Sequence, residues 1–174
     1  MIKKIKSRFR KVQIKREDTV SLVTEQIPNT ETTFLLPILS DAEEGEERIR
    51  ATLLDPTCTV YASWLDGQLA GAAVIRWEEE EPSEIVYIAV APDLRGCGYG
   101  KQIIHFLQEE LRRRRGHSLL VGTANAALEN IAFYQKCGFR MSEIRRDYFA
   151  YIQPPIAEHG IVLRDMVVLR YDLE

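Results

Sequence analysis

The stretch from Val90 to Lys101, V-A-P-D-L-R-G-C-G-Y-G-K, holds the residue pattern best suited to chemistry in this 174-residue chain. Its three alternating glycines, Gly96, Gly98 and Gly100, follow an apolar run and precede a run with helical spacing. Glycine lets backbone amides approach a ligand closely, and a helix N-terminus offers free amide donors with a partial positive charge. The pattern predicts an anion site suited to a phosphate or pyrophosphate, with an ordinary glycine-rich turn as the alternative.

Spacing excludes two common nucleotide-binding loops. A P-loop needs Gly-Lys followed by Ser or Thr, whereas Gln102 follows Gly100-Lys101 here. A dinucleotide-binding G-x-G-x-x-G loop would need its third glycine at position 101, which is Lys. That loop also belongs to an early βαβ unit, whereas this one lies past the middle of the chain, after strand-like hairpins.

Other nucleophilic or metal-ligating side chains lack a matching pattern. The cysteines are odd in number, and neither they nor the histidines have partners at ligand or triad spacing: Cys58, Cys97, Cys137, His105, His117 and His159. Cys97 is interpreted as a small filler inside the glycine loop. The sequence therefore implies no metal, and its unpaired cysteines are typical of a reduced, cytoplasmic protein.

Charge is distributed unevenly around the formal net value of −3. Met1–Arg16 contains eight Lys or Arg and no acid, whereas Glu43–Glu47 and Glu78–Glu81 are acidic. The basic start lacks the apolar region of a secretion signal, and its Val12–Ile14 alternation favours a charged edge strand over a nucleic-acid arm. No apolar run approaches the ~20 residues of a membrane-spanning helix. We expect neither nucleic acid nor a membrane as a partner.

The elements before the loop are predicted from caps, breakers and periodicity. Residues 11–15 are expected to form a first strand, and Asp18 to cap a short helix running to about Gln26. Ser40 or Asp41 is expected to open an amphipathic segment whose buried side consists of Ile49, Leu53 and Leu54.

A hairpin and a strand lead into the loop. Thr57–Trp64 and Gln68–Trp77 flank Asp66-Gly67, which is a strong tight-hairpin signal. Glu84–Val90 is the next predicted strand. Strict alternation would place on one of its faces Glu84, Val86, Ile88 and Val90.

Helices and strands alternate after the loop. A helix is expected to begin near Gly100 and to end at Gly116. Its apolar side recurs at spacings of three and four residues and consists of Ile103, Ile104, Leu107 and Leu111. Ser118–Gly122 is a predicted strand, and the next helix runs to Cys137, with Gly138 in the left-handed conformation and Phe139 folding back on Phe133 or Tyr134. A strand from about Arg140 and a final strand from Ile161 to Tyr171 complete a mixed α/β domain without repeat or linker.

Two motifs in this order resemble the N-acetyltransferase superfamily called GNAT. Arg95–Gly100, R-G-C-G-Y-G, matches the acetyl-CoA loop R/Q-x-x-G-x-G/A of that family, and Glu84–Val90 is similar to the strand before it. Some thirty residues later, Phe133–Phe139, F-Y-Q-K-C-G-F, resembles the family's Y-x-K-x-G-F segment. The resemblance covers about residues 57–140, and the tail P-P-I-A-E-H-G-I-V-L-R-D-M is similar to a bacterial subgroup of uncharacterised members.

Length and composition predict a single domain over residues 1–174. The resemblance implies that it has a mixed, mostly antiparallel sheet of about seven strands and about four helices. The sheet is expected to splay between its fourth and fifth strands, with acetyl-CoA in that cleft and the acceptor entering from the other side. Pyrophosphate contacts are expected from Arg95, Gly96, Cys97, Gly98, Tyr99, Gly100 and Lys101, and pantetheine and acetyl contacts from Ile88, Ala89 and Val90.

Direct acetyl transfer requires a neutral amine, and neutralising an alkylamine at pH 7 costs about 4–5 kcal/mol. A general base is therefore expected, and the resemblance places Glu84 where some family members carry a catalytic glutamate. An ordinary glutamate at the end of a strand is the alternative. The resemblance also makes Tyr134 the general acid for the CoA thiolate, with a core tyrosine as the alternative.

Asn125 or Asn130 could hydrogen-bond the pantetheine, although the family's usual asparagine position holds Ala127 here. Helix capping explains Asn125 equally well.

The sequence does not name the acceptor. The leading hypothesis is a primary amine on a small molecule; the alternatives are a protein or peptide amine and a CoA-binding module without catalysis. The resemblance implies that Tyr148–Tyr151 and Pro154–Gly160 line the acceptor pocket. The sequence leaves a homodimer as one alternative, since an exposed final strand could pair between two copies.

Overall fold

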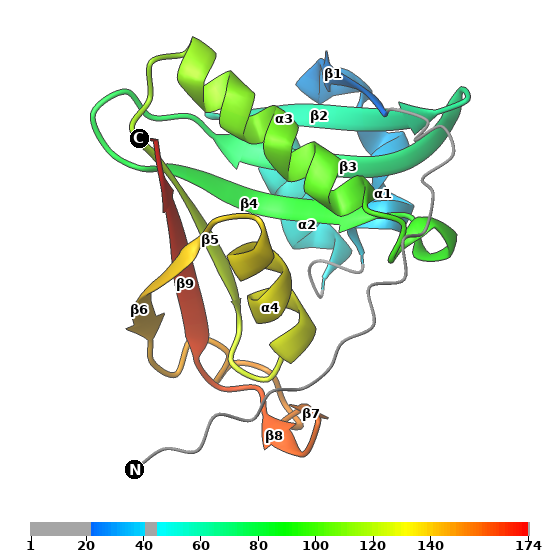
Figure 1. Cartoon of the computed structure of the whole chain (residues 1–174). Coiled ribbons are helices and arrows are strands. Elements are labelled where there is room, and N and C mark those ends of the chain that lie inside the picture. The colour runs from blue at the N-terminus through cyan, green and yellow to red at the C-terminus, as the bar shows by residue number, and fades with distance from the viewer. Residues whose placement is uncertain (1–21, 41–44, 174) are drawn as a thin grey trace, which may run out of the picture.

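One seven-stranded sheet organises the computed structural model, which describes residues 22–40 and 45–173 (Figure 1). Its spatial order is β1 (Val23–Ile27), β2 (Cys58–Leu65), β3 (Gln68–Arg76), β4 (Ser83–Val90), β5 (Ser118–Ala124), β9 (Met166–Asp172) and β6 (Arg140–Arg145). A small hairpin of β7 (Ala157–Glu158) and β8 (Ile161–Val162) lies beside it. The predicted fold class is confirmed: a mixed α/β structure with a mostly antiparallel sheet.

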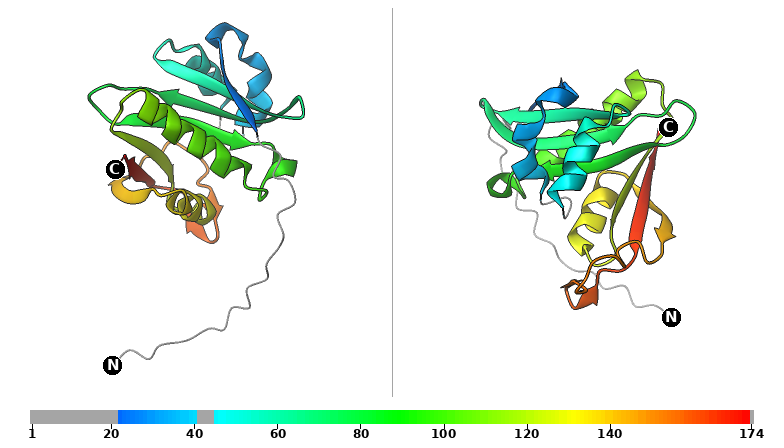
Figure 2. Two further views of the ribbon diagram at one scale, coloured as in Figure 1. Left: turned by 45° about the horizontal axis from the view of Figure 1, so that its top comes forward. Right: turned by 180° about the vertical axis from the view of Figure 1, so that it is seen from behind.

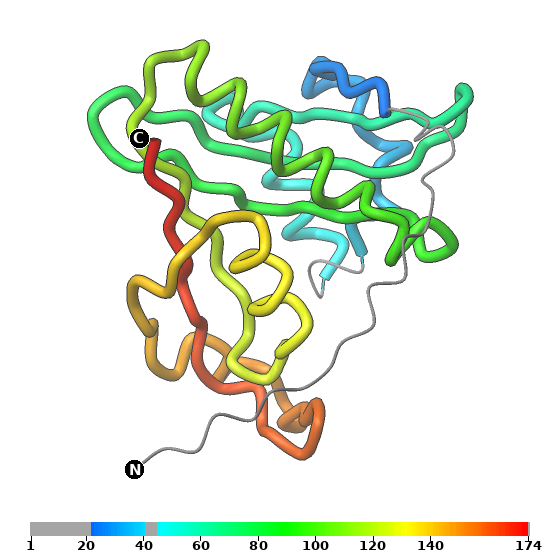
Figure 3. The backbone as a smooth tube through the Cα atoms, in the orientation of Figure 1, coloured from blue at the N-terminus to red at the C-terminus, as the bar shows by residue number. Residues whose placement is uncertain are grey.

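The sheet splays between its fourth and fifth strands, as expected. β4 and β5 are the parallel pair, and they are in register over three residues alone, Ser83–Ile85 with Leu119–Val121. Beyond these residues the two strands run apart, which the backbone tube shows (Figure 3). We call this divergence the splay; the first arm is β1–β4 and the second arm is β5, β9 and β6.

Helices cover the two faces of the sheet in pairs (Figure 2). On one face, α3 (Tyr99–Arg113) and α4 (Leu128–Lys136) pack in a core that includes Ile85, Leu107 and Leu169. On the other face, α1 (Leu36–Leu39) and α2 (Glu46–Leu54) pack in a second core around Leu35 and Val74. Short 3-10 turns lie at Asn29–Glu31, Thr33–Leu35 and Pro92–Leu94.

α3 fits the predicted pattern closely, and Ile103, Ile104, Leu107 and Leu111 are all buried. Its approach to the sheet depends on Gly71, where a Cβ would lie 2.6 Å from Ile103 Cδ1 and 2.9 Å from the carbonyl oxygen of Ala89. The predicted stop at Gly116 is displaced by one residue. Arg115 has the left-handed backbone (φ 59°), and the Gly116 amide then bonds back to the Leu111 carbonyl, as a Schellman motif requires.

Two early expectations need correction. The helix expected to reach Gln26 is instead the edge strand β1, which pairs with β2 and whose Thr24 hydroxyl hydrogen-bonds Ser63 Oγ at 2.8 Å. Pairing with β2 therefore overrides the local cap signal. The predicted cap Asp18 and the strand expected at residues 11–15 lie outside the described residues. In α2, which begins at Glu46 and not near Ser40, Leu54 is 64% exposed because it lies off the stripe that buries Ile49 and Leu53.

The final strand is also shorter than predicted. The expected run from Ile161 to Tyr171 divides into β8 and β9, separated by residues 163–165. β9 lies between β5 and β6, so it is not the exposed edge that the dimer hypothesis considered. The edge of the second arm is β6, and a register shift between Met141 and Glu143 interrupts its pairing with β9.

Candidate active site

A β-bulge in β4 determines which side chains face which side of the sheet. In the register with β3, Ile75 pairs with Ile85 and Val74 pairs with Tyr87, which leaves Val86 without a partner. One extra residue in a strand reverses the alternation of side chains beyond it. The single face predicted for the whole of β4 is therefore wrong.

The bulge separates Glu84 from the apolar residues nearer the loop. Ile88 and Val90 pack in the core under α3 and α4, whereas Val86 packs in the core under α1 and α2. Arg76, the cross-strand partner of Glu84, reaches the residue that caps the C-terminal end of α2. Glu84 thus lies on the α1/α2 face, opposite Ile88 and Val90.

The backbone of β4 directs the amides and carbonyls of alternate residues into the splay. The Ala91 amide donates to the Ala70 carbonyl of β3 at 2.9 Å. Because hydrogen-bonded residues alternate along an antiparallel ladder, the amide and carbonyl of Ala89 also point toward β3. Ile88 and Val90 direct their amides and carbonyls the other way. Consistently, the Val90 carbonyl accepts a 3.1 Å hydrogen bond from Nε of the Arg95 side chain in the loop. The predicted cofactor contacts of Ile88, Ala89 and Val90 stay predictions; of these residues, Ile88 and Val90 are the two whose backbone groups are directed into the splay.

The glycine loop ends at the N-terminus of α3. Gly96 (φ 76°) and Gly98 (φ 89°) have left-handed backbones, and a Cβ at either position would meet no atom within 4 Å. These glycines are therefore required by conformation, and the space beside them is open. Gly98 is the N-cap, and the amides of the first turn, Tyr99 to Lys101, have no acceptor within the helix. This cradle fits a pyrophosphate.

α4 packs against the same loop from the second arm. A Cβ on Gly100 would lie 3.3 Å from Phe133 Cζ and 3.5 Å from Val90 Cγ2, so the missing side chain lets the two arms meet. Gln108 of α3 donates a 2.9 Å hydrogen bond to the carbonyl of Cys137 at the end of α4. These contacts hold α4 beside the cradle.

Tyr134 lies in this wall of the splay, 6% exposed, with its ring edge-on to Phe133 (5.1 Å) and Phe139 (5.8 Å). The predicted return of the chain is confirmed, because Gly138 is left-handed (φ 92°) and the Phe139 amide donates to the Tyr134 carbonyl. Burial, and then the neighbouring Cys137, raise the pKa of the phenol well above its ordinary value. The hydroxyl makes no hydrogen bond to a described residue, yet it is not among the buried polar atoms sealed from solvent.

Glu84 belongs to an ion-pair chain on the opposite face. Its carboxylate lies 3.2 Å from Arg76 and 3.5 Å from Arg145 of β6, and its side chain is 35% exposed. Arg76 also pairs with Asp55 at 3.7 Å. Because Glu84 pairs in register with Leu120, it lies at the closed end of the splay. The sequence contained no sign of these partners, since Arg145 is 61 residues further along the chain.

Asn125 does not cap α4, whose N-cap is Ala127 without a side-chain hydrogen bond. Its Oδ1 accepts from the amides of Arg164 (3.0 Å) and Asp165 (3.1 Å), and its Nδ2 donates to the Val162 carbonyl (3.0 Å). The side chain therefore fixes the connection between β8 and β9, and the capping interpretation is wrong.

Asn130 reaches back to β5, where its Nδ2 lies 3.4 Å from Thr123 Oγ1. A pantetheine contact from Asn125 or Asn130 stays a prediction.

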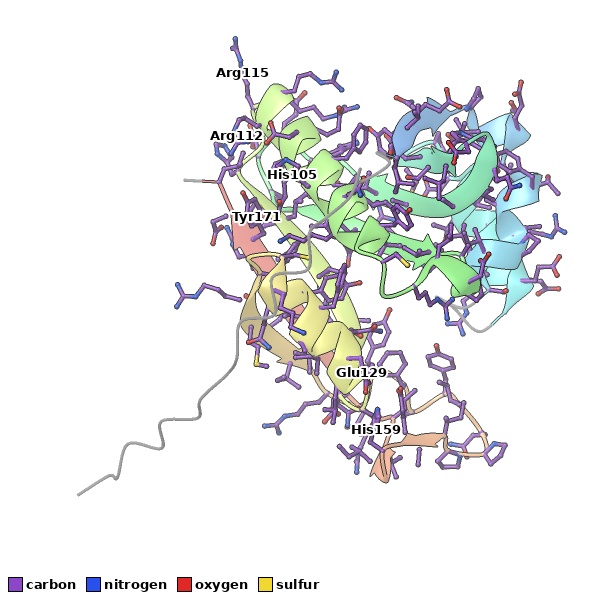
Figure 4. All side chains as sticks on the ribbon, turned by 45° about the vertical axis from the view of Figure 1, so that its right-hand side comes forward. His105, Arg112, Arg115, Glu129, His159 and Tyr171 are labelled. Carbon is purple, nitrogen blue, oxygen red and sulfur yellow. The ribbon has the colours of Figure 1, made fainter. Side chains whose placement is uncertain are left out.

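The structure also joins residues that spacing did not connect. His159 Nε2 lies 2.9 Å from Glu129 and 3.8 Å from Glu158, at the surface between the start of α4 and the β7–β8 turn (Figure 4). His105, by contrast, projects from α3 far from this group (Figure 4). Cys97 is exposed in the loop, its thiol against the carbonyl of Arg95.

No helix in the described part of the chain is long and apolar enough to cross a membrane.

The comparisons with known proteins agree with this geometry. Residues 24–139 match the model of the Acetyltransferase (GNAT) family. A Bacillus subtilis (strain 168) protein described as uncharacterized N-acetyltransferase YvbK is 37% identical over 114 residues, which are 65% of this chain and 74% of the relative.

Two solved structures are similar over 88% of this chain. An acetyltransferase from Bacillus subtilis in complex with CoA has a TM-score of 0.80 and 31% identity, with all of that chain covered. A GNAT family acetyltransferase from Elizabethkingia anophelis with acetyl-CoA bound has a TM-score of 0.80 and 27% identity, with 99% covered. The glycine cradle and the splay fit acetyl-CoA as the cosubstrate, and this chain belongs to the GNAT family of acetyltransferases.

Proposed function

We propose that the chain transfers an acetyl group from acetyl-CoA directly to the primary amine of a small molecule. One observation carries the proposal: the two predicted catalytic side chains lie on opposite faces of the splay. Tyr134 lies on the α3/α4 face with the cradle, and Glu84 lies on the α1/α2 face. A donor and an acceptor that enter from different faces would each meet the group suited to it.

The donor is acetyl-CoA, whose acetyl group is held in a thioester. Backbone groups of the chain would position this donor and polarise its carbonyl. The first amides of α3 would hold the pyrophosphate, and the amides of Ile88 and Val90, directed into the splay, would follow the pantetheine arm. An amide aimed at a carbonyl oxygen stabilises negative charge on that oxygen, most strongly where water is excluded.

Glu84 is the proposed proton acceptor for the amine on the α1/α2 face. Its two guanidinium partners, Arg76 and Arg145, hold the carboxylate between the arms. A general base at this place removes the ammonium proton, directly or through water, before attack.

Tyr134 is the proposed proton donor on the cofactor face. Because burial raises the pKa of its phenol, the hydroxyl stays protonated across the neutral range. A phenol that makes no hydrogen bond to a described residue is free to donate to a departing thiolate sulfur.

The proposal is tested by free-thiol release from acetyl-CoA across a panel of small primary amines, with tertiary amines of the same skeleton as controls. We expect release with a subset of the primary amines and background with the controls. Background release across the panel, with acetyl-CoA binding confirmed by calorimetry, would refute catalysis on small amines. Acetylation of peptides alone, detected by mass spectrometry, would move the acceptor class to peptides.

A further inference from the structure

Among the described residues, two contacts connect the two sides of the splay on the α1/α2 face, where the acceptor is proposed to enter. One is the ion pair between Glu84 of β4 and Arg145 of β6, at 3.5 Å, near the closed end of the splay. The other joins Arg48 in the first turn of α2 to Tyr151, which follows β6: the guanidinium lies 4.5 Å from the ring centroid. Residues 103 positions apart thus meet between the arms.

Tyr151 is presented by a firmly built turn. The Ala150 amide donates to the Asp147 carbonyl at 3.0 Å, and the Asp147 amide donates to Asp165 Oδ1 at 2.8 Å. Arg164 pairs with the Asp147 carboxylate at 2.7 Å. These bonds connect the turn before Tyr151 to the chain between β8 and β9 and involve no atom of Arg48.

The contact itself is weak enough to open. Tyr151 is 48% exposed and Arg48 is exposed, so water reaches the pair from outside. A cation–π pair at such a site favours the closed arrangement by a factor of about two to five. A ligand that needs the open arrangement then binds with an affinity reduced by the fraction of molecules that are open.

We propose that the Arg48–Tyr151 contact closes the acceptor side of the splay and selects small amines over extended peptides; this rests on the proposed function. In this proposal the acceptor enters through the space between the Glu84–Arg145 ion pair and the Arg48–Tyr151 contact. A small amine passes through it, whereas a peptide main chain has to displace the contact first. Arg48 and Tyr151 are specificity residues in this proposal and do not touch the reacting atoms.

A double-mutant cycle measures this contact. The quantity is the ratio of kcat/KM for a hexapeptide with a free N-terminal amine to kcat/KM for the best small amine. We expect Arg48→Ala and Tyr151→Ala each to raise this ratio about two- to fivefold, and the double variant to raise it no further. Tyr151→Phe keeps the ring and should keep the wild-type ratio. Arg50→Ala removes the same charge from the same helix and should change nothing.

Additive single effects, an unchanged ratio in Tyr151→Ala, or an equal change in Arg50→Ala would each overturn the proposal. Its failure is distinguishable from failure of the proposed function. If the wild type turns over no acceptor, the contact is tested by calorimetry, which measures the affinity of the CoA-loaded protein for the same hexapeptide. Binding two- to fivefold tighter in Tyr151→Ala than in wild type supports the contact as a barrier, and equal or undetectable binding in both counts against it.

Discussion

Replacement of Tyr134 by Phe separates catalysis from folding at the proposed acid. The substitution removes one hydroxyl from a ring that is 6% exposed and keeps the edge contacts with Phe133 and Phe139. No described residue loses a hydrogen-bond partner, so the free energy of unfolding near pH 7 should change by less than about 1 kcal/mol. Acetyl-CoA affinity should also stay close to that of the wild type.

Turnover should respond much more strongly than stability. Positioned proton transfer contributes about 10²–10⁴-fold to a rate. A thiolate with a pKa of about 8.5 leaves fairly easily even when unassisted, so we expect the lower end, a kcat reduced about 10²-fold. That corresponds to about 2.7 kcal/mol of transition-state stabilisation.

The raised pKa of Tyr134 gives a second signature. The native state holds the phenolic proton more tightly than the unfolded chain, whose tyrosine pKa is about 10. The associated stability is complete below pH 10 and declines as pH rises above it. Wild type and Tyr134→Phe should therefore unfold alike at pH 8, and above pH 10 the wild type alone should lose up to about 1.4 kcal/mol per pH unit from this group.

Three measurements test these expectations. Steady-state thiol release gives kcat, calorimetry gives the acetyl-CoA affinity, and denaturant unfolding at pH 8 and pH 10.5 gives the stability. An unchanged kcat with intact cofactor binding would refute the acid role. A kcat loss matched by a comparable stability loss would show that the ring packing, and not proton transfer, had been disturbed.

Three further substitutions probe the scaffold and the base. Gly71→Ala should lower the unfolding free energy by about 1–3 kcal/mol, because its Cβ would lie 2.9 Å from the backbone oxygen of Ala89; denaturant melts check this. In Gly98→Ala the new Cβ meets open space, but the left-handed backbone is strained by about 1–2 kcal/mol. Calorimetry should show an acetyl-CoA affinity reduced roughly tenfold, and the loss of unfolding free energy should be smaller than in Gly71→Ala. Glu84→Gln should cut kcat about 10²–10⁴-fold while costing under about 1 kcal/mol of stability, since its ion pairs are partly exposed. Wild-type turnover in Glu84→Gln would leave that residue a structural role only.

The parts of the fold that depend on local sequence were predictable. The Asp66-Gly67 turn, the helical stripe from Ile103 to Leu111 and the reversal at Gly138 each follow from a few neighbouring residues, and all three are present. The cradle was predictable for the same reason, since its backbone angles are a property of Gly96 and Gly98.

Features that depend on long-range pairing were not predictable from the pattern. β1 is a strand because β2 is beside it, although the local residues favour a cap and a helix. Asn125 carries a capping signal, but the chain around Val162 and Arg164 uses its side chain instead. No local rule connects Arg48 with Tyr151, because the contact exists only after both arms have formed.

The bulge at Val86 has the largest functional consequence of these long-range features. Without it, strict alternation would place Glu84 on the same face as Ile88 and Val90, which is the face that α3 covers. The extra residue turns Glu84 to the α1/α2 face, while the side chains of Ile88 and Val90 stay on the α3/α4 face and their backbone groups are directed into the splay. In the proposed direct transfer, this one inserted residue lets the same strand face the donor with its Ile88 and Val90 backbone and the acceptor with Glu84.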